Sequence, residues 1–178
     1  VVWTGIPGTQ GCISLGKVLS GQINPSGRLV DTYAYDVSSA PASENFGSYK
    51  YDNMNGMAFI NYEEGIYVGY RYYETRYAGD EAGYRKAVQY PFGHGLSYTD
   101  FAWETVNFAV ENEMVNWEVK VTNTGDVAGK DVVQLYFTAP YIPGGIEKSA
   151  IELAAYDKTE LLQPGESETL TVSFPVRD

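Results

Sequence analysis

Residues 115–126 of this 178-residue chain are VNWEVKVTNTGD. Apolar and polar residues alternate from Val115 to Val121, and Asn123 to Asp126 are residue types that favour a turn. Successive side chains of a strand point to opposite faces, so this alternation predicts a strand with one buried face. The turn residues predict that the chain then reverses, as it does between antiparallel strands.

The same alternation recurs further along the chain. It predicts strands over residues 132–137, residues 151–156 and the stretch that carries Leu170, Val172 and Phe174. Residues 163–166, QPGE, predict the turn before the last of these strands. Short alternating strands with turns between them indicate an antiparallel β-sandwich that begins near Phe101.

A different pattern occupies the N-terminal part of the chain. It predicts a short buried strand over residues 1–6, a helix with Thr9 as its cap over residues 12–19, and a strand over residues 28–34. Strand, helix and strand in this order are typical of one α/β unit, which cannot enclose a core alone. The expected fold class is therefore α+β, mostly β, with a partial α/β sandwich unit followed by the antiparallel β-sandwich.

Residues 36–60 show no sustained periodicity and are rich in Ser, Asn, Gly, Met and Tyr. The segment is longer than most connections within a compact domain, which indicates either a functional loop or a partly mobile one. Three aromatic residues, Phe46, Tyr49 and Tyr51, lie among its polar residues. They are the candidate substrate-binding residues of the chain.

A tyrosine-dense segment follows, YEEGIYVGYRYY at residues 62–73, and the glycine-rich PFGHGLSYTDF comes later, at residues 91–101. Aromatic rings pack on the C–H face of a sugar, and carboxylates bind its hydroxyl groups and act on its glycosidic oxygens. The first segment therefore has the residue types of a carbohydrate site. We expect a strand here, in which the adjacent Glu63 and Glu64 point to opposite faces and cannot flank one bond from the same side.

If this segment is a strand, its charged and aromatic residues have a structural role. One of the two carboxylates is expected to pair with Arg71 or Arg76 and the other to be solvated. The tyrosines also alternate in facing, so they cannot form one sugar platform. We expect interdomain packing with hydrogen-bonded hydroxyl groups for all four: Tyr67, Tyr70, Tyr72 and Tyr73.

The charge of the chain limits its partners. It has 23 acidic and 12 basic residues, a formal net charge of -11, which repels phosphate backbones and anionic membranes. We therefore expect neither nucleic acid nor a membrane as a partner. No signal peptide is visible, and a cytoplasmic and a secreted location both stay open.

Cysteine and histidine are too few for the common metal sites. Cys12 and His94 are the only residues of their kinds, so we expect no intrachain disulfide, no metal site and no cofactor. His94 lies between two glycines, which favours a turn-shaping role over general-base catalysis.

Several motifs occur in a specific order along the chain. They are GQINPSGRL at residues 21–29, the segments 62–73 and 91–101, VTNTGDVAGKDVVQLY at residues 121–136 and LLQPGES at residues 161–167. This series closely resembles the C-terminal portion of glycoside hydrolase family 3, the β-glucosidase and β-xylosidase family. The resemblance covers nearly the whole chain.

The resemblance implies a division of the chain into domains. Residues 1–75 correspond to the C-terminal part of the family's α/β sandwich domain, residues 76–98 to a connecting segment, and residues 99–178 to a truncated fibronectin type III-like domain. The 36–60 loop is most similar to a bacterial subgroup, in which the family's (β/α)8-type barrel can follow these domains in the chain.

The resemblance also implies where the catalytic groups lie. Retaining glycosidases use two carboxyl groups about 5 Å apart, as nucleophile and acid/base. In this family the nucleophile is an aspartate of the barrel, and the acid/base glutamate usually lies in a sandwich-domain motif. Neither motif is present, so we assign no catalytic residue to this chain and expect it to be inactive alone.

The sequence is compatible with two functions. The first is a docking part of an exo-acting β-glycosidase, with the missing barrel and the rest of the sandwich domain as partners and a β-linked glycoside as substrate of the complete enzyme. The rim of that enzyme's pocket would then include Phe46, Tyr49 and Tyr51. The second is a stand-alone carbohydrate-binding or adhesion module, which would leave the α/β unit unexplained. A fragment should also expose an apolar face and aggregate or form a homo-oligomer.

Overall fold

The computed structural model describes residues 2–46 and 49–176. The chain forms two compact units that do not follow the order of the sequence. Unit 1 comprises Val1–Gly27, Gly95–Leu135 and Ala154–Asp178, and unit 2 comprises Arg28–His94 and Tyr136–Leu153. Antiparallel strands dominate and short helices connect them, which confirms the expected mostly β fold class.

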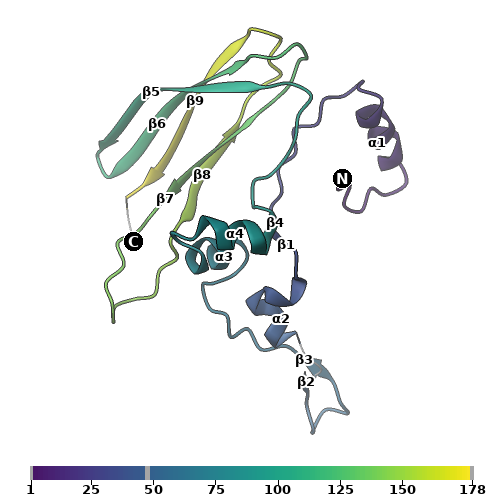
Figure 1. Ribbon diagram of the computed structural model, residues 1–178, viewed down its shortest axis with the longest axis vertical. Helices are drawn as coiled ribbons and strands as arrows, with labels where there is room; N and C mark the ends of the chain where they lie inside the picture. The colour runs from purple at the N-terminus through teal and green to yellow at the C-terminus, as the bar shows by residue number, and fades with distance from the viewer. Residues whose placement is uncertain (1, 47–48, 177–178) are drawn as a thin grey trace. The chain divides into compact units, whose positions relative to one another are not determined.

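The strands expected from the alternating segments are present. One sheet has the order β5-β6-β9, and β7 pairs with β8 (Figure 1). The strands are β5 (Phe101–Glu111), β6 (Met114–Asn123), β7 (Val132–Phe137), β8 (Glu152–Lys158) and β9 (Ser167–Pro175). The buried core consists of Val119, Val121, Val133, Leu162, Leu170 and Val172. The apolar positions of the alternation are thus the ones that the sheet buries.

Strand β5 contains a β-bulge at Val106. Thr105 lies opposite Val119, and the next residue in register with β6 is Asn107, so Val106 is an extra residue in the strand. Because of this insertion, Phe108 faces the same side of the sheet as Thr105, although three positions separate them. The side of β5 that carries Phe101 and Trp103 therefore continues past the bulge with Phe108 and Val110.

The side chain of Asn123 organises the turn predicted after β6. Its amide nitrogen donates to the carbonyl oxygens of Val127 and Leu162, both at 2.9 Å. Its Oδ1 accepts hydrogen bonds from the Thr99 hydroxyl at 2.7 Å and the Gly125 N–H at 3.1 Å. The side chain is fully buried, and these four bonds satisfy it, as a buried amide requires.

The N-terminal helix is close to its expected position. Helix α1 spans Gly11–Leu19 and is followed by Ser20 as its C-cap. Its N-cap is Gln10, so the assignment of Thr9 as the cap is wrong by one residue. Its side chains are not buried, which leaves the apolar residues Ile13 and Leu19 exposed.

The two strands predicted around this helix are largely absent. Residues 2–6 form no strand and are exposed, and Val1 lies outside the described residues. Of the strand expected over residues 28–34, only β1 (Tyr33–Ala34) is present, paired with β4 (Val88–Tyr90). A strand needs a neighbour to bind its backbone groups, and within the described part of the chain residues 2–6 pair with no strand.

The 36–60 segment holds more regular structure than its composition indicates. It contains η1 (Val37–Ser39), α2 (Pro41–Asn45), β2 (Tyr49–Lys50) and β3 (Ala58–Phe59). Strands β2 and β3 are antiparallel, and between them Asn55 and Gly56 have φ values of 51° and 74°. Asn-Gly is a dipeptide favoured for such turns, so this part of the loop is a hairpin.

The strand predicted over residues 62–73 is wrong. Residues 62–69 form no strand, and helix α3 begins at Tyr70 and ends at Arg76. Tyrosine favours strands, but here a helix buries Tyr73, which is 2% exposed. Residues three or four apart share a helix face, so Tyr70 and Tyr73 lie together and the alternation of facing does not apply.

A second helix, α4 (Glu81–Ala87), lies in the stretch expected to be a connection. The Asp80 carboxylate caps it by accepting a hydrogen bond from the Gly83 N–H at 2.9 Å, and Glu81 pairs with Arg85 one turn later. Across residues 2–46 and 49–176, none of the helices is long and apolar enough to cross a membrane.

Candidate functional site

The β2–β3 hairpin brings two of the candidate substrate-binding residues together. The ring centroids of Tyr49 and Tyr51 lie 5.6 Å and 4.5 Å from that of Phe59. The Tyr51 N–H also donates to the Met57 carbonyl oxygen at 3.0 Å. These contacts make an aromatic cluster, the hairpin cluster, of the exposed Tyr49 and Tyr51 and the half-buried Phe59.

The third candidate, Phe46, lies just after α2 and its side chain is 78% exposed. Among the described residues, no ring contact joins it to the hairpin cluster. Phe59 is a member of this cluster that the sequence analysis does not identify. The Asn55-Gly56 dipeptide indicates a turn, but a two-residue turn there would not give the observed register, in which Tyr49 pairs with Phe59.

The two adjacent carboxylates of the tyrosine-dense segment do not form a catalytic pair on a strand. Glu63 accepts a hydrogen bond from the Asn61 amide at 3.5 Å, and Glu64 lines a shallow hollow with Arg76. Arg71, one of the expected partners, lies 3.9 Å from Glu152. Residues 63 and 64 are not in a strand, so the expectation that the two carboxylates point to opposite faces of one is wrong.

Among the residues that the structure describes, the hydroxyl groups of three of these four tyrosines are hydrogen-bonded as expected, those of Tyr67, Tyr70 and Tyr73. Tyr67 donates to the Glu147 carboxylate, which raises the pKa of Tyr67. Tyr70 Oη accepts from the backbone N–H of Leu153 at 2.9 Å, and the hydroxyl group of Tyr73 bonds to that of Ser39 at 3.0 Å.

These bonds form part of a larger attachment within unit 2. The Thr75 hydroxyl oxygen accepts a hydrogen bond from the Ala150 N–H at 2.8 Å, close to the Leu153 contact. Helix α3 therefore binds β8 and the segment just before it through two side-chain oxygens. Fixing this segment in place is a structural role, and it explains why tyrosines are dense here without a shared sugar platform.

His94 has the contacts of a turn residue. Its carbonyl oxygen accepts the Leu29 N–H at 2.8 Å, and its ring centroid lies 5.1 Å from that of Tyr90. The adjacent Gly93 has a φ of 80°, a conformation that glycine adopts without strain. This geometry supports the turn-shaping role.

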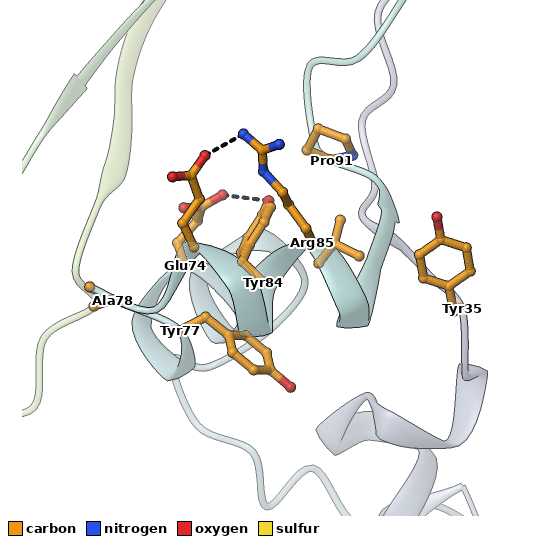
Figure 2. A pocket seen from close by; sticks show the side chains of 10 residues that line it. Tyr35, Glu74, Tyr77, Ala78, Tyr84, Arg85 and Pro91 are labelled. Atoms are coloured by element: carbon orange, nitrogen blue, oxygen red, sulfur yellow. Dashed lines mark hydrogen bonds and ion pairs between the residues drawn. The ribbon is translucent and has the colours of Figure 1, made fainter.

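A groove of about 640 Å³ runs along α3 and α4 within unit 2. Figure 2 shows Tyr77 and Tyr35 beside it, with Tyr84 and Glu74 joined by a hydrogen bond of 2.7 Å. Burial, followed by the hydrogen bond to Glu74, raises the pKa of Tyr84. This phenol therefore stays protonated at neutral pH and donates to Glu74.

The part of the chain that the structure describes holds no cluster of three histidine, cysteine or acidic side chains able to bind a metal ion. Cys12 is exposed on α1.

Two domain families match the chain. Residues 1–70 match the glycosyl hydrolase family 3 C-terminal domain, and residues 131–178 match the fibronectin type III-like domain. The chain belongs to glycosyl hydrolase family 3. The resemblance drawn from the ordered motifs is therefore confirmed.

Family 3 relatives match along nearly the entire chain. Beta-glucosidase A of Butyrivibrio fibrisolvens is 38% identical over 100% of this chain and 21% of its own length. Beta-glucosidase B of Emericella nidulans is 38% identical over 99% of this chain and 20% of its own length. The family 3 relatives thus include bacterial and fungal proteins.

Solved family 3 structures share the fold as well. A beta-glucosidase from Paenibacillus barengoltzii is 43% identical, with a TM-score of 0.78 over 93% of this chain and 17% of its own. Beta-glucosidase 3B from Thermotoga neapolitana, solved with glucose, is 40% identical with a TM-score of 0.77. The chain spans about a fifth of the length of the relatives it matches.

Proposed function

We propose that this chain is the docking and structural part of a retaining, exo-acting β-glucosidase that hydrolyses terminal β-D-glycosidic bonds in carbohydrate breakdown. The observation that carries the proposal is identity of 38% to a β-glucosidase along the whole chain, over both domain matches. The catalytic pair is supplied by residues outside these 178. A bacterial source is proposed from the similarity of the 36–60 loop to a bacterial subgroup, since a bacterial and a fungal relative match this chain equally well.

The domain division proposed for the complete enzyme follows the sequence motifs. Residues 1–75 belong to the α/β sandwich domain, residues 76–98 connect, and residues 99–178 belong to the fibronectin type III-like domain. The domain matches over residues 1–70 and 131–178 are compatible with these bounds and support them. Helix α4 and strand β4 then lie within the connecting segment.

The partners of the chain are the (β/α)8-type barrel and the rest of the sandwich domain. Large apolar side chains lie exposed before and along α1, as expected for a surface that another domain covers. They include Trp3, Ile6, Ile13 and Leu19. The same exposure would promote self-association of the isolated chain.

The hairpin cluster and Phe46 form part of the rim of the active-site pocket in the complete enzyme. Phe46, Tyr49 and Tyr51 are exposed, Phe59 is half-buried, and all lie in the segment between two short strands, β1 and β4. An exposed ring can stack on the second sugar of a disaccharide. The rim therefore contributes to leaving-group recognition through Phe46, Tyr49 and Tyr51.

The proposal is tested by assaying the complete protein and this chain side by side on an aryl β-glucoside. We expect turnover by the complete protein and none by the isolated chain. An inactive but folded complete protein would contradict the glycosidase assignment. Turnover by the isolated chain that Glu63→Gln or Glu64→Gln abolishes would contradict the non-catalytic role.

A further inference from the structure

Contacts within unit 2 hold the residues that line the groove along α3 and α4. Tyr35, at one side, is held by a hydrogen bond of 3.0 Å from its backbone N–H to the Ala87 carbonyl oxygen. Tyr77 follows the last residue of α3, with its ring centroid 6.4 Å from that of Tyr84 in an edge-on arrangement. Val88, 6% exposed, lines the groove as well.

The Glu74 carboxylate gives the groove an acceptor for neutral donors. Glu74 Oε1 accepts the Tyr84 hydroxyl, which uses only part of the capacity of a carboxylate. Glu81 is paired with Arg85, so the three charged residues of the lining carry one net negative charge. An anionic ligand is disfavoured by that charge.

The lining matches a ligand with both an apolar face and hydroxyl donors. Tyrosine rings present flat apolar surface, and the Glu74 carboxylate can accept hydroxyl groups. The volume of about 640 Å³ falls within the range of small-molecule sites, about 300–1,000 Å³. A pyranose ring combines these two properties.

We propose that this groove, lined by Tyr35, Glu74, Tyr77 and Tyr84, binds a neutral sugar, and specifically a β-linked glucosyl unit. The preference for a neutral sugar rests on the charges and rings of the groove. The choice of β-linked glucose rests on the proposed function. The site would hold an oligosaccharide chain against the enzyme and so raise the local concentration of this substrate.

The test is a calorimetric titration of the 178-residue chain with cellobiose and maltose. We expect Tyr77→Ala to weaken cellobiose binding by about three- to tenfold, as loss of one aromatic contact should. Glu74→Gln keeps the side-chain shape and should also weaken it. Tyr62→Ala is the matched control, because Tyr62 is 84% exposed in unit 2 and does not line the groove.

Three results would overturn the proposal. They are no cellobiose binding by the unmodified chain, binding unchanged in both folded groove variants, or equal affinity for maltose. Folding is verified for each variant by its thermal unfolding curve. Aryl β-glucoside hydrolysis by the complete enzyme is measured separately, so failure of the groove proposal is distinguished from failure of the proposed function.

Discussion

The hydroxyl oxygen of Tyr70 accepts a hydrogen bond from the backbone N–H of Leu153 at 2.9 Å. The two residues are far apart in the sequence, and the contact joins the start of α3 to strand β8. The ring of Tyr70 also packs on Phe92, with centroids 4.7 Å apart. One side chain therefore connects three segments of unit 2.

Replacing Tyr70 by phenylalanine isolates the value of this hydrogen bond. The ring contact is kept, while the Leu153 N–H loses its acceptor. We expect the free energy of unfolding to fall by about 1 kcal/mol, measured by urea denaturation. Tyr62→Phe, at an exposed position, should change it little, and an equally small change in Tyr70→Phe would contradict the role given to this bond.

Gly125 lies where a side chain would not fit. A Cβ atom there would be 2.3 Å from Thr99 Oγ1 and 2.9 Å from the Asp100 backbone nitrogen. Gly125→Ala should therefore destabilise the protein by about 2 kcal/mol or more, measured by thermal unfolding. Gly16→Ala is the matched control.

The control probes an open position. Gly16 lies within α1, and its Cβ would meet nothing within 4 Å. We expect Gly16→Ala to raise helix stability by up to about 1 kcal/mol. Equal losses in the two variants would mean that crowding at Thr99 is not the cause.

The free energy of unfolding should fall at alkaline pH because of Tyr136. Burial, with Tyr70 and Glu74 nearby, raises the pKa of Tyr136 from 10.0 to about 12. The folded state then favours the protonated phenol, so this stabilisation is present below pH 10 and is lost as pH rises toward 12. Denaturation midpoints measured across this range should fall, and less so in Tyr136→Phe. Parallel pH profiles for the two proteins would refute the assignment.

The rim role predicts a selective kinetic effect in the complete enzyme. Tyr49→Ala should raise KM for disaccharides by about three- to tenfold and leave KM for small aryl glucosides nearly unchanged. The reason is that a disaccharide has a second sugar ring that can stack on Tyr49. Tyr62→Ala serves as the control. Equal changes in KM for both substrate types would argue against contact between Tyr49 and the leaving group.

The sandwich was predictable because its signal is local. Val119 and Val121 alternate with polar residues, and the sheet buries them. The signal fails in unit 2, where Tyr70 and Tyr73 have the composition of a strand but form a helix. The contacts that decide this, such as Tyr70 with Leu153, are distant in the sequence and leave no periodic pattern.

Other features were missed although local signals existed. Asp80 followed by Glu81 and Arg85 is a cap and an ion pair typical of a helix start, yet the segment was assigned to a connection. The candidate site was only partly predictable for a different reason. Tyr49 and Tyr51 are joined through Phe59, and that pairing depends on the register of a short hairpin.

The bulge at Val106 gives β5 one residue more than the segment of β6 that it faces, without changing the side on which the later residues lie. Removing Val106 would leave Thr105 next to Asn107, opposite Val119 and Glu118 as they are now, so Phe108 would keep its side of the sheet. The bulge therefore absorbs a change in length that would reverse the facing of residues in a regular strand. In an alignment of related chains, a single-residue gap between Trp103 and Phe108 would signify a strand without the bulge and not a rearranged face.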